Sequence, residues 1–152
     1  MQKIYFLCTG NSCRSQMAEG YGCALLPRDQ FEVKSAGIET HGLNPKAVAV
    51  MAEDGVDISQ QTSDLIDATY FQEADLIITL CGDAKDKCPR IPLTATHLHW
   101  DLQDPAKAQG SEAEIMAAFR KTRDLVKAHV LELLNVTAEE NCPSWKIPAP
   151  PF

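Results

Sequence analysis

Two apolar runs in this sequence end at a cysteine, and they limit the fold more than any other feature. Residues 3–7 (KIYFL) and residues 74–80 (ADLIITL) have the length and the β-forming residues of buried strands. Cys8 follows the first run directly, and Cys81 follows the second. In a parallel sheet, ligands bind beyond the carboxyl ends of the strands. We therefore predict that the two thiols lie at one edge of a sheet, where a ligand would bind.

Further strands alternate with helices along the chain. Strands are predicted at 31–37 and 96–100. Helices are predicted from capping residues, helical spacing of apolar residues and proline stops, at 15–26, 44–53, 62–73 and 111–134. Alternation of this kind predicts an α/β fold with a four-stranded parallel sheet flanked by helices on both faces.

Length and charge narrow the class of protein. A chain of 152 residues can bury one core, and we predict a single catalytic domain over residues 1–134 with an extended, proline-rich tail over 135–152. The net charge of -7 argues against nucleic acid and anionic membranes as partners. The apolar run before Cys8 is too short for a signal peptide, and no stretch is long enough to span a membrane. We expect a cytoplasmic monomer.

Six cysteines in a cytoplasmic chain indicate metal binding or redox chemistry more than structural disulfides. They are Cys8, Cys13, Cys23, Cys81, Cys88 and Cys142. Zinc stays open as an alternative because His97 and His99 follow the fourth and fifth cysteines, although the cysteine spacings do not match those of zinc fingers. Cys13 and Cys23 are expected to pack as small apolar groups. Cys142 is expected to be an uninvolved thiol.

The segment CTGNSCRS, which begins at Cys8, combines the groups that an oxyanion site needs. A loop between a strand and a helix can turn its backbone N–H groups toward an anion, and the helix N-terminus adds positive charge. Gly10 and Asn11 tolerate the positive φ angles of such a loop, and Arg14 can bind two oxygens at once. We expect an acidic, nucleophilic Cys8 that accepts a hydrogen bond from Ser15. The predicted oxyanion-binding residues are Thr9, Gly10, Asn11, Ser12, Cys13, Arg14 and Ser15.

The same segment resembles the active-site loop of the low-molecular-weight protein tyrosine phosphatases. The resemblance implies that Cys8 is the nucleophile, that Arg14 binds the oxyanion, and that Asp104, in an Asp-Pro pair, is the general acid. Two departures separate the chain from these phosphatases. Gln16 stands where they have a proline after Arg-Ser, and Ala106-Lys107 replaces the tyrosines that follow their Asp-Pro pair.

Longer segments are similar to the thioredoxin-coupled arsenate reductases, which share the phosphatase fold. These segments are FLCTGNSCRSQMAEG, SAGIETHGLNPKA, QTSDLI and TLCGDAKDKCP, and the similarity runs from about Ile4 to the end of the last predicted helix. It implies a relay in which Cys8 attacks arsenate, Cys81 attacks Cys8, and Cys88 attacks Cys81. Thioredoxin would then reduce the final disulfide, and phosphate or sulfate would mimic arsenate.

This resemblance also implies a potassium ion beside the loop and no tightly bound cofactor. The matching residues carry side-chain oxygens, which suit a hard cation. They are Asn11, Glu19, Ser35, Thr62 and Asp64. Hydrogen bonds that brace the loop and cap helices are an equally supported interpretation of the same residues.

Three functions are open, and individual residues distinguish them. Arsenate reduction uses both Cys81 and Cys88, whereas a tyrosine or small-molecule phosphatase, the main alternative, needs only Cys8. An oxyanion-binding or arsenic-sensing module, the third, has no use for the general acid Asp104. If Cys8 is only a structural cysteine in a tight turn, none of the three applies.

Overall fold

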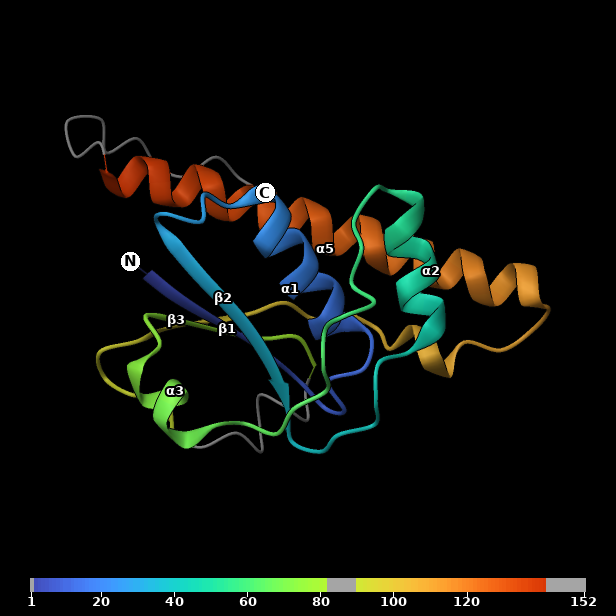
Figure 1. Ribbon diagram of the computed structural model, residues 1–152, viewed down its shortest axis with the longest axis horizontal. Coiled ribbons are helices and arrows are strands. Elements are labelled where there is room, and N and C mark those ends of the chain that lie inside the picture. The colour runs from blue at the N-terminus through green and yellow to red at the C-terminus, as the bar shows by residue number, and fades with distance from the viewer. Residues whose placement is uncertain (1, 82–89, 142–152) are drawn as a thin grey trace.

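The computed structural model describes residues 2–81 and 90–141, and its centre is a four-stranded parallel sheet (Figure 1). The strands are β1 (Gln2–Cys8), β2 (Phe31–Gly37), β3 (Leu76–Thr79) and β4 (Thr96–His99), and they lie in the order β2-β1-β3-β4. All three strand pairs are parallel, with Cys8 opposite Gly37 and Thr79 opposite His99. The predicted α/β fold with a parallel sheet is confirmed.

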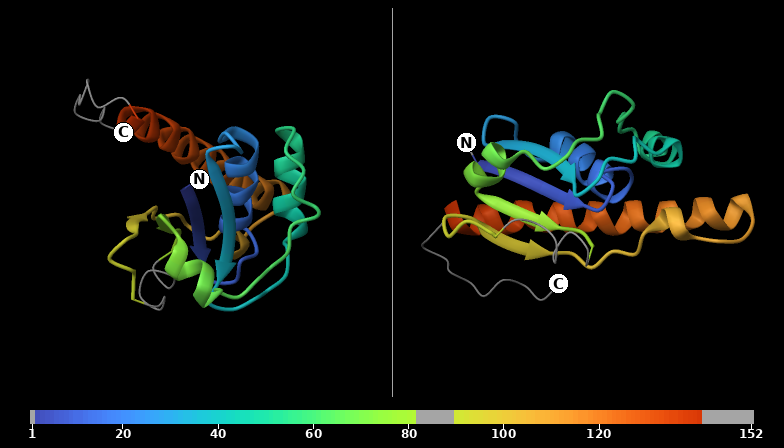
Figure 2. Two further views of the ribbon diagram at one scale, coloured as in Figure 1. Left: turned by 60° about the vertical axis from the view of Figure 1, so that its left-hand side comes forward. Right: turned by 90° about the horizontal axis from the view of Figure 1, so that it is seen from below.

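Helices cover both faces of this sheet, as predicted. They are α1 (Arg14–Leu25), α2 (Pro45–Glu53), α3 (Ala68–Glu73), the short 3-10 helix η1 (Pro105–Lys107) and α5 (Glu112–Asn141). The long helix α5 packs against α1, α2 and η1. Figure 2 shows α3 on the opposite side of the strands from α1 and α2.

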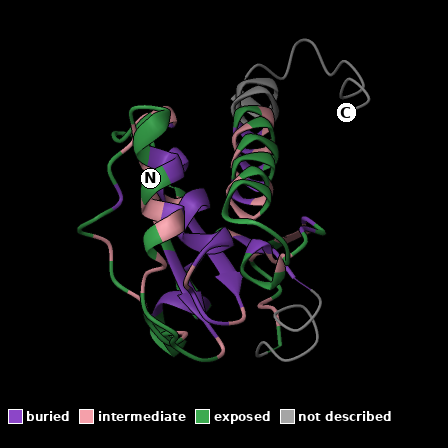
Figure 3. Cartoon of the chain, turned by 90° about the vertical axis from the view of Figure 1, so that its right-hand side faces the viewer, coloured by how far each residue is buried: buried purple, intermediate pink, exposed green. Residues whose placement is uncertain are grey.

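Each face of the sheet has its own layer of core residues, because successive β1 side chains point to opposite faces. Phe6 faces α1 and α5, where it joins Met17 and Phe119 in the larger cluster. Leu7 faces α3 and joins Phe71 in the smaller cluster. Figure 3 shows the buried residues gathered in the strands and in the inner helix surfaces, and the exposed residues along the outer surface of α5.

Two helix starts predicted from capping residues are confirmed. Asn44 accepts a hydrogen bond from the Lys46 backbone N–H at 2.8 Å, and Pro45 occupies the first turn of α2. Before α5, the Ser111 Oγ accepts from the Glu114 backbone N–H at 3.2 Å, and the Glu114 carboxylate accepts from the Ser111 hydroxyl at 3.3 Å.

The helix predicted over residues 62–73 begins later, at Ala68, with Asp67 as its cap. Residues 62–67 are extended instead, because this segment pairs with the end of β2. The Gly37 backbone N–H donates to the Asp64 carbonyl at 2.8 Å, and the Ile66 N–H donates to the Gly37 carbonyl at 3.2 Å. Tertiary pairing therefore overrides the local capping signal.

The last helix, which was predicted to end at residue 134, continues to Asn141, so residues 135–141 are helical and not extended. Residues 135–141 include good helix formers, and the first proline that would stop a helix is Pro143. The rest of the predicted tail, 142–152, lies outside the described residues. No helix in the described part of the chain is both long and apolar enough to cross a bilayer.

Candidate active site

The candidate site lies at the carboxyl edge of the sheet, where β1 and β3 end side by side. The Leu80 backbone N–H donates to the Leu7 carbonyl at 2.9 Å, so the residues that follow the two strands stay together. The Thr9 Oγ1 and the Cys81 Sγ lie 3.1 Å apart, within hydrogen-bond distance. Cys8 and Cys81 are both thiols and both buried, at 3% and 6% exposure. The predicted approach of the two cysteines is confirmed.

The loop between β1 and α1 has the backbone form of an anion site. Asn11 adopts a positive φ of 47°, a conformation that asparagine tolerates better than most residues. Helix α1 begins at Arg14 with no side-chain cap from Cys13 and no acidic residue in its first turn. The positive end of this helix is therefore uncompensated locally, and it can attract an anion.

The buried side chain of Asn11 holds the loop in this form. Its Nδ2 donates to the Ser15 Oγ at 2.8 Å and to the Ser35 Oγ at 2.9 Å. Its Oδ1 accepts from the Asp64 backbone N–H at 2.7 Å. One amide thus joins α1, β2 and the segment after α2 to the loop.

Sequence reasoning missed three residues that also brace the loop. The Ser63 hydroxyl and the His41 backbone N–H both donate to the Gly10 carbonyl, at 3.0 and 2.9 Å. The Gln16 Nε2 donates to the Asn11 carbonyl at 2.9 Å. Gln16 was visible in the sequence as the residue that replaces the phosphatase proline, and its amide supplies a bond that proline lacks.

Asn11→Ala is expected to destabilise the fold by about 2–3 kcal/mol, because it leaves buried partners without hydrogen bonds. The measurement is urea unfolding followed by circular dichroism. Asn44→Ala, which removes only the cap of α2, is the matched control, with an expected loss of about 1 kcal/mol. Equal losses in the two variants would contradict the role given to Asn11.

Arg14 is buried beneath the loop, with 6% of its surface exposed. Its Nη1 donates to the Leu102 carbonyl at 3.0 Å, and its Nη2 lies 3.6 Å from the Asp104 Oδ2. Its Nε has no hydrogen-bond partner among the described residues. A buried guanidinium with an unpaired N–H suits an incoming oxyanion, which would supply the missing acceptor.

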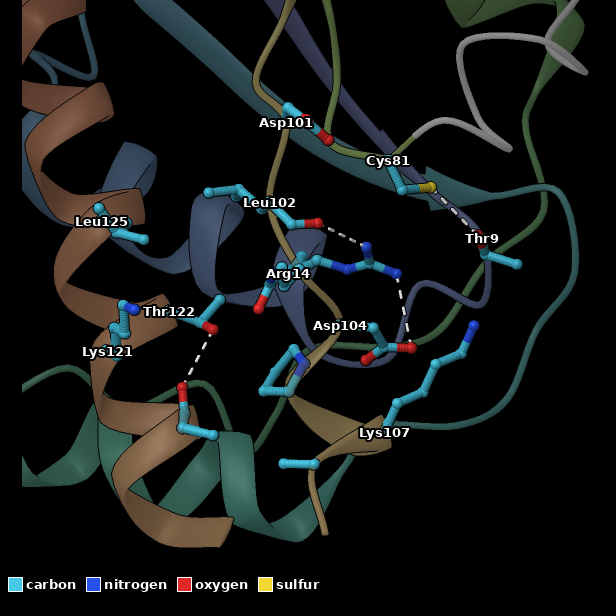
Figure 4. Close-up of a pocket in the computed structure, with 14 residues that line it drawn as sticks. Thr9, Arg14, Cys81, Asp101, Leu102, Asp104, Lys107, Lys121, Thr122 and Leu125 are labelled. Carbon is cyan, nitrogen blue, oxygen red and sulfur yellow. Dashed lines mark hydrogen bonds and ion pairs between the residues drawn. The ribbon is translucent and has the colours of Figure 1, made fainter. Parts of the chain in front are cut away.

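Asp104 lies beside Arg14, and Figure 4 shows its carboxylate facing the guanidinium. Its Oδ1 accepts from the Ala106 backbone N–H at 2.9 Å, which fixes the carboxylate at the start of η1. Arg14 and Asp104 both line a cavity of about 720 Å³, together with Thr9 and Cys81. The structure thus brings four predicted site residues, Cys8, Arg14, Cys81 and Asp104, into one region.

The expectation of an acidic Cys8 is wrong for this arrangement of the two thiols. A hydrogen bond with Cys81 and burial raise the pKa of Cys8 well above its usual range, whereas Arg14 and the Thr9 N–H pull it down. Ser15, the predicted donor to Cys8, accepts a hydrogen bond from Asn11 at its hydroxyl oxygen. The acidity of Cys8 therefore depends on where the Cys81 thiol lies.

The remaining cysteines differ in their surroundings. Cys13 is 4% exposed within the larger core cluster, and burial raises its pKa to about 11, so it packs as an apolar group as predicted. Cys23 was expected in the core but is only half-buried, near the C-terminal end of α1. Cys88 and Cys142 lie outside the described residues.

The five residues matched to a potassium site are connected beside the loop. The Ser35 hydroxyl donates to the Glu19 Oε1 at 2.5 Å, and the Thr62 hydroxyl donates to the Asp64 Oδ2 at 2.7 Å. Asn11 joins the two pairs. Burial and the nearby negative charge of Asp64 raise the pKa of Glu19, although its bond from Ser35 opposes this. Two neighbouring carboxylates and several oxygens fit a hard cation.

Comparison with known proteins places this site in a family. The sequence matches the low molecular weight phosphotyrosine protein phosphatases over residues 3–142, and the chain belongs to this family. Curated relatives from Halalkalibacterium halodurans and Bacillus subtilis, 59% and 60% identical over 121 residues, are named arsenate reductases. These matches cover 80% of this chain and 86% of each relative.

Solved structures agree with this placement. An arsenate reductase in the phosphate binding state has a TM-score of 0.74 and 37% identity, covering 89% of this chain and 98% of that chain. The structure of an arginine phosphatase from Geobacillus stearothermophilus matches with a TM-score of 0.77. The match covers 97% of this chain and 99% of the phosphatase chain. Its identity is 22%, so this second likeness concerns the fold alone.

Proposed function

We propose that this protein reduces arsenate to arsenite through a relay of thiols. The observation that supports it most is the second thiol, Cys81, held against Cys8 and Thr9 at an oxyanion site. A phosphatase needs one nucleophilic thiol, because water completes its reaction. Reduction of As(V) to As(III) needs two electrons, which a pair of thiols can supply. Relatives that share about 60% of the sequence are named for this activity.

The first step forms a bond between sulfur and arsenic. Arsenate enters the loop, where Arg14 and the N-terminal end of α1 hold its oxygens. The Cys8 thiolate attacks arsenic, and one oxygen leaves as water after Asp104 gives it a proton. Arsenic remains As(V) in this adduct. Because the hydrogen bond with Cys81 raises the pKa of Cys8, formation of the Cys8 thiolate requires the Cys81 thiol to move out of that bond, whereas Arg14 favours the thiolate.

The second step transfers the electrons. The Cys81 thiolate attacks the Cys8 sulfur, the electron pair of the S–As bond passes to arsenic, and arsenite leaves. The product is a Cys8–Cys81 disulfide. Cys88, outside the described residues, then attacks Cys81 and releases the Cys8 thiolate. The resulting Cys81–Cys88 disulfide would be reduced by thioredoxin, in keeping with a cytoplasmic, monomeric enzyme.

The test measures arsenite formation from arsenate with thioredoxin, its reductase and NADPH. We expect one NADPH oxidised for each arsenite, and no activity in the Cys8→Ser variant. The same assay with glutathione and glutaredoxin in place of thioredoxin identifies the electron donor, and we expect lower activity with this pair. Hydrolysis of an aryl phosphate without any arsenate-dependent NADPH oxidation would overturn the proposal in favour of a phosphatase.

We further propose that potassium binds between Glu19 and Asp64 and stabilises the loop. KCl at about 0.1 M, if this is ten times the dissociation constant, should raise the melting temperature by about 3–6 °C relative to choline chloride. Glu19→Gln, which keeps the shape and removes the charge, should abolish this difference. An equal melting temperature in both salts for the wild type would mean that these residues only brace the loop.

A further inference from the structure

We propose that Lys107 is a substrate-binding residue that attracts doubly charged oxyanions, and that an ammonium group in place of an aromatic ring at this position leaves aryl phosphate esters without a stacking partner, which favours small inorganic oxyanions. This inference rests on the proposed function, because it names the class of substrate that the same site selects. It depends on the position of Lys107, on the charges around Arg14 and on the side chains that line the cavity.

Lys107 ends η1, the short helix that begins after Asp104. It lines the same cavity as Thr9 and Arg14. Figure 4 shows its side chain running from η1 past Asp104 toward Thr9. Lys107 is exposed, and it makes no ion pair within the described part of the chain. Its charge is therefore available to a ligand.

The negative charges near Arg14 oppose the approach of a dianion, and the positive charge of Lys107 offsets them. Two carboxylates, Asp101 and Asp104, line the cavity with Arg14, and the whole chain carries a net charge of -7. A dianion that approaches the loop meets this negative field before it reaches the buried guanidinium. Lys107, an exposed residue of the same lining, adds a positive charge. Lys121 also lines the cavity, but Figure 4 shows it on α5 beside Thr122, on the other side from Thr9.

The cavity wall gives an aryl ester little to bind. None of the described residues that line the cavity is aromatic, and its apolar lining is aliphatic. The apolar residues are Leu102, Pro105, Ala108, Ala118 and Leu125. An aromatic leaving group would find no ring on which to stack. The wall therefore offers no stacking surface to an aryl group, while Lys107 supplies the charge that binds the oxyanion itself.

The test is the affinity for inorganic phosphate, measured by calorimetry at about 0.02 M and about 0.5 M NaCl. At low salt, Lys107→Gln should weaken binding by about three- to tenfold, and high salt should remove most of this difference. Lys107→Arg, which keeps the charge, should bind as the wild type does. Lys121→Gln, the matched control on α5, should change the affinity by less than about twofold.

Turnover provides the second measurement. Lys107→Gln should raise the KM for arsenate and leave kcat nearly unchanged, because the charge acts on binding and not on the chemical step. Lys107→Tyr should raise kcat/KM for an aryl phosphate relative to arsenate. Phosphate binding by Lys107→Gln as tight as in the wild type at low salt would overturn the inference. Salt-sensitive loss of phosphate binding without any arsenate reduction would support it and refute only the proposed function.

Discussion

Cys81→Ala is expected to stop arsenate turnover and, at the same time, to make Cys8 more acidic. Turnover stops because no thiol remains to attack the Cys8 sulfur and release arsenite. The pKa of Cys8 falls because its hydrogen bond with the Cys81 thiol is the largest cause that raises it. A fall in pKa means that more thiolate is present at neutral pH, so the alkylation of Cys8 should accelerate. The measurement is the rate of iodoacetamide reaction at Cys8 as a function of pH.

The sign of the shift makes this prediction specific. In the wild type the alkylation rate rises with pH toward the raised pKa of Cys8, and in Cys81→Ala the same rise should occur at lower pH. Cys23→Ala, near the C-terminal end of α1 and away from the site, is the control and should leave the Cys8 profile in place. A Cys8 profile that stays unchanged or moves to higher pH in Cys81→Ala would contradict the coupling between the two thiols.

Arg14→Lys is expected to lower kcat/KM for arsenate by about 10²–10³-fold, although the charge is conserved. The guanidinium donates to the Leu102 carbonyl, lies beside Asp104 and keeps its Nε unpaired among the described residues. A lysine has neither the planar fork nor the reach to bind two oxygens at once. The measurements are the kcat/KM for arsenate from steady-state kinetics and the affinity for inorganic phosphate from calorimetry.

Arg28→Lys is the matched control for Arg14→Lys. Arg28 contacts the Cys23 carbonyl at 3.4 Å near the far end of α1, away from the site. Its replacement should leave kcat/KM and the phosphate affinity within about twofold of the wild type. If Arg14→Lys retained wild-type kcat/KM, the guanidinium would not be the oxyanion-binding group.

The sheet was predictable because its signals are local. Residues 31–37 coincide with β2, and the β1 prediction differs from the structure by one residue at each end. The extended segment 62–67 was not predictable, because it follows from pairing with Gly37 and Asn11, which are distant in sequence. The end of α5 was harder to predict, because residues 135–141 are mostly polar and mix the good helix formers Ala138, Glu139 and Glu140 with poorer ones.

The site was predictable in composition and less so in its electrostatics. Cys8 and Arg14 lie in one short loop, so their proximity follows from local sequence. Asp104 entered through a family resemblance, and the structure places it 3.6 Å from Arg14. The high pKa of Cys8 could not be inferred, because a thiol from another strand causes it. The hydrogen bonds from Ser63 and His41 to the Gly10 carbonyl could not be inferred either, because they join segments that are distant in sequence.

The most direct test of the relay is a single turnover without any reductant. Reduced protein is mixed with one equivalent of arsenate, the thiols are blocked with an alkylating agent, and the disulfides are located by peptide mass spectrometry. The account predicts one arsenite per chain and a Cys81–Cys88 disulfide, with a Cys8–Cys81 disulfide in Cys88→Ser instead. Arsenate left unreduced, with Cys8, Cys81 and Cys88 all still alkylated as thiols, would contradict it.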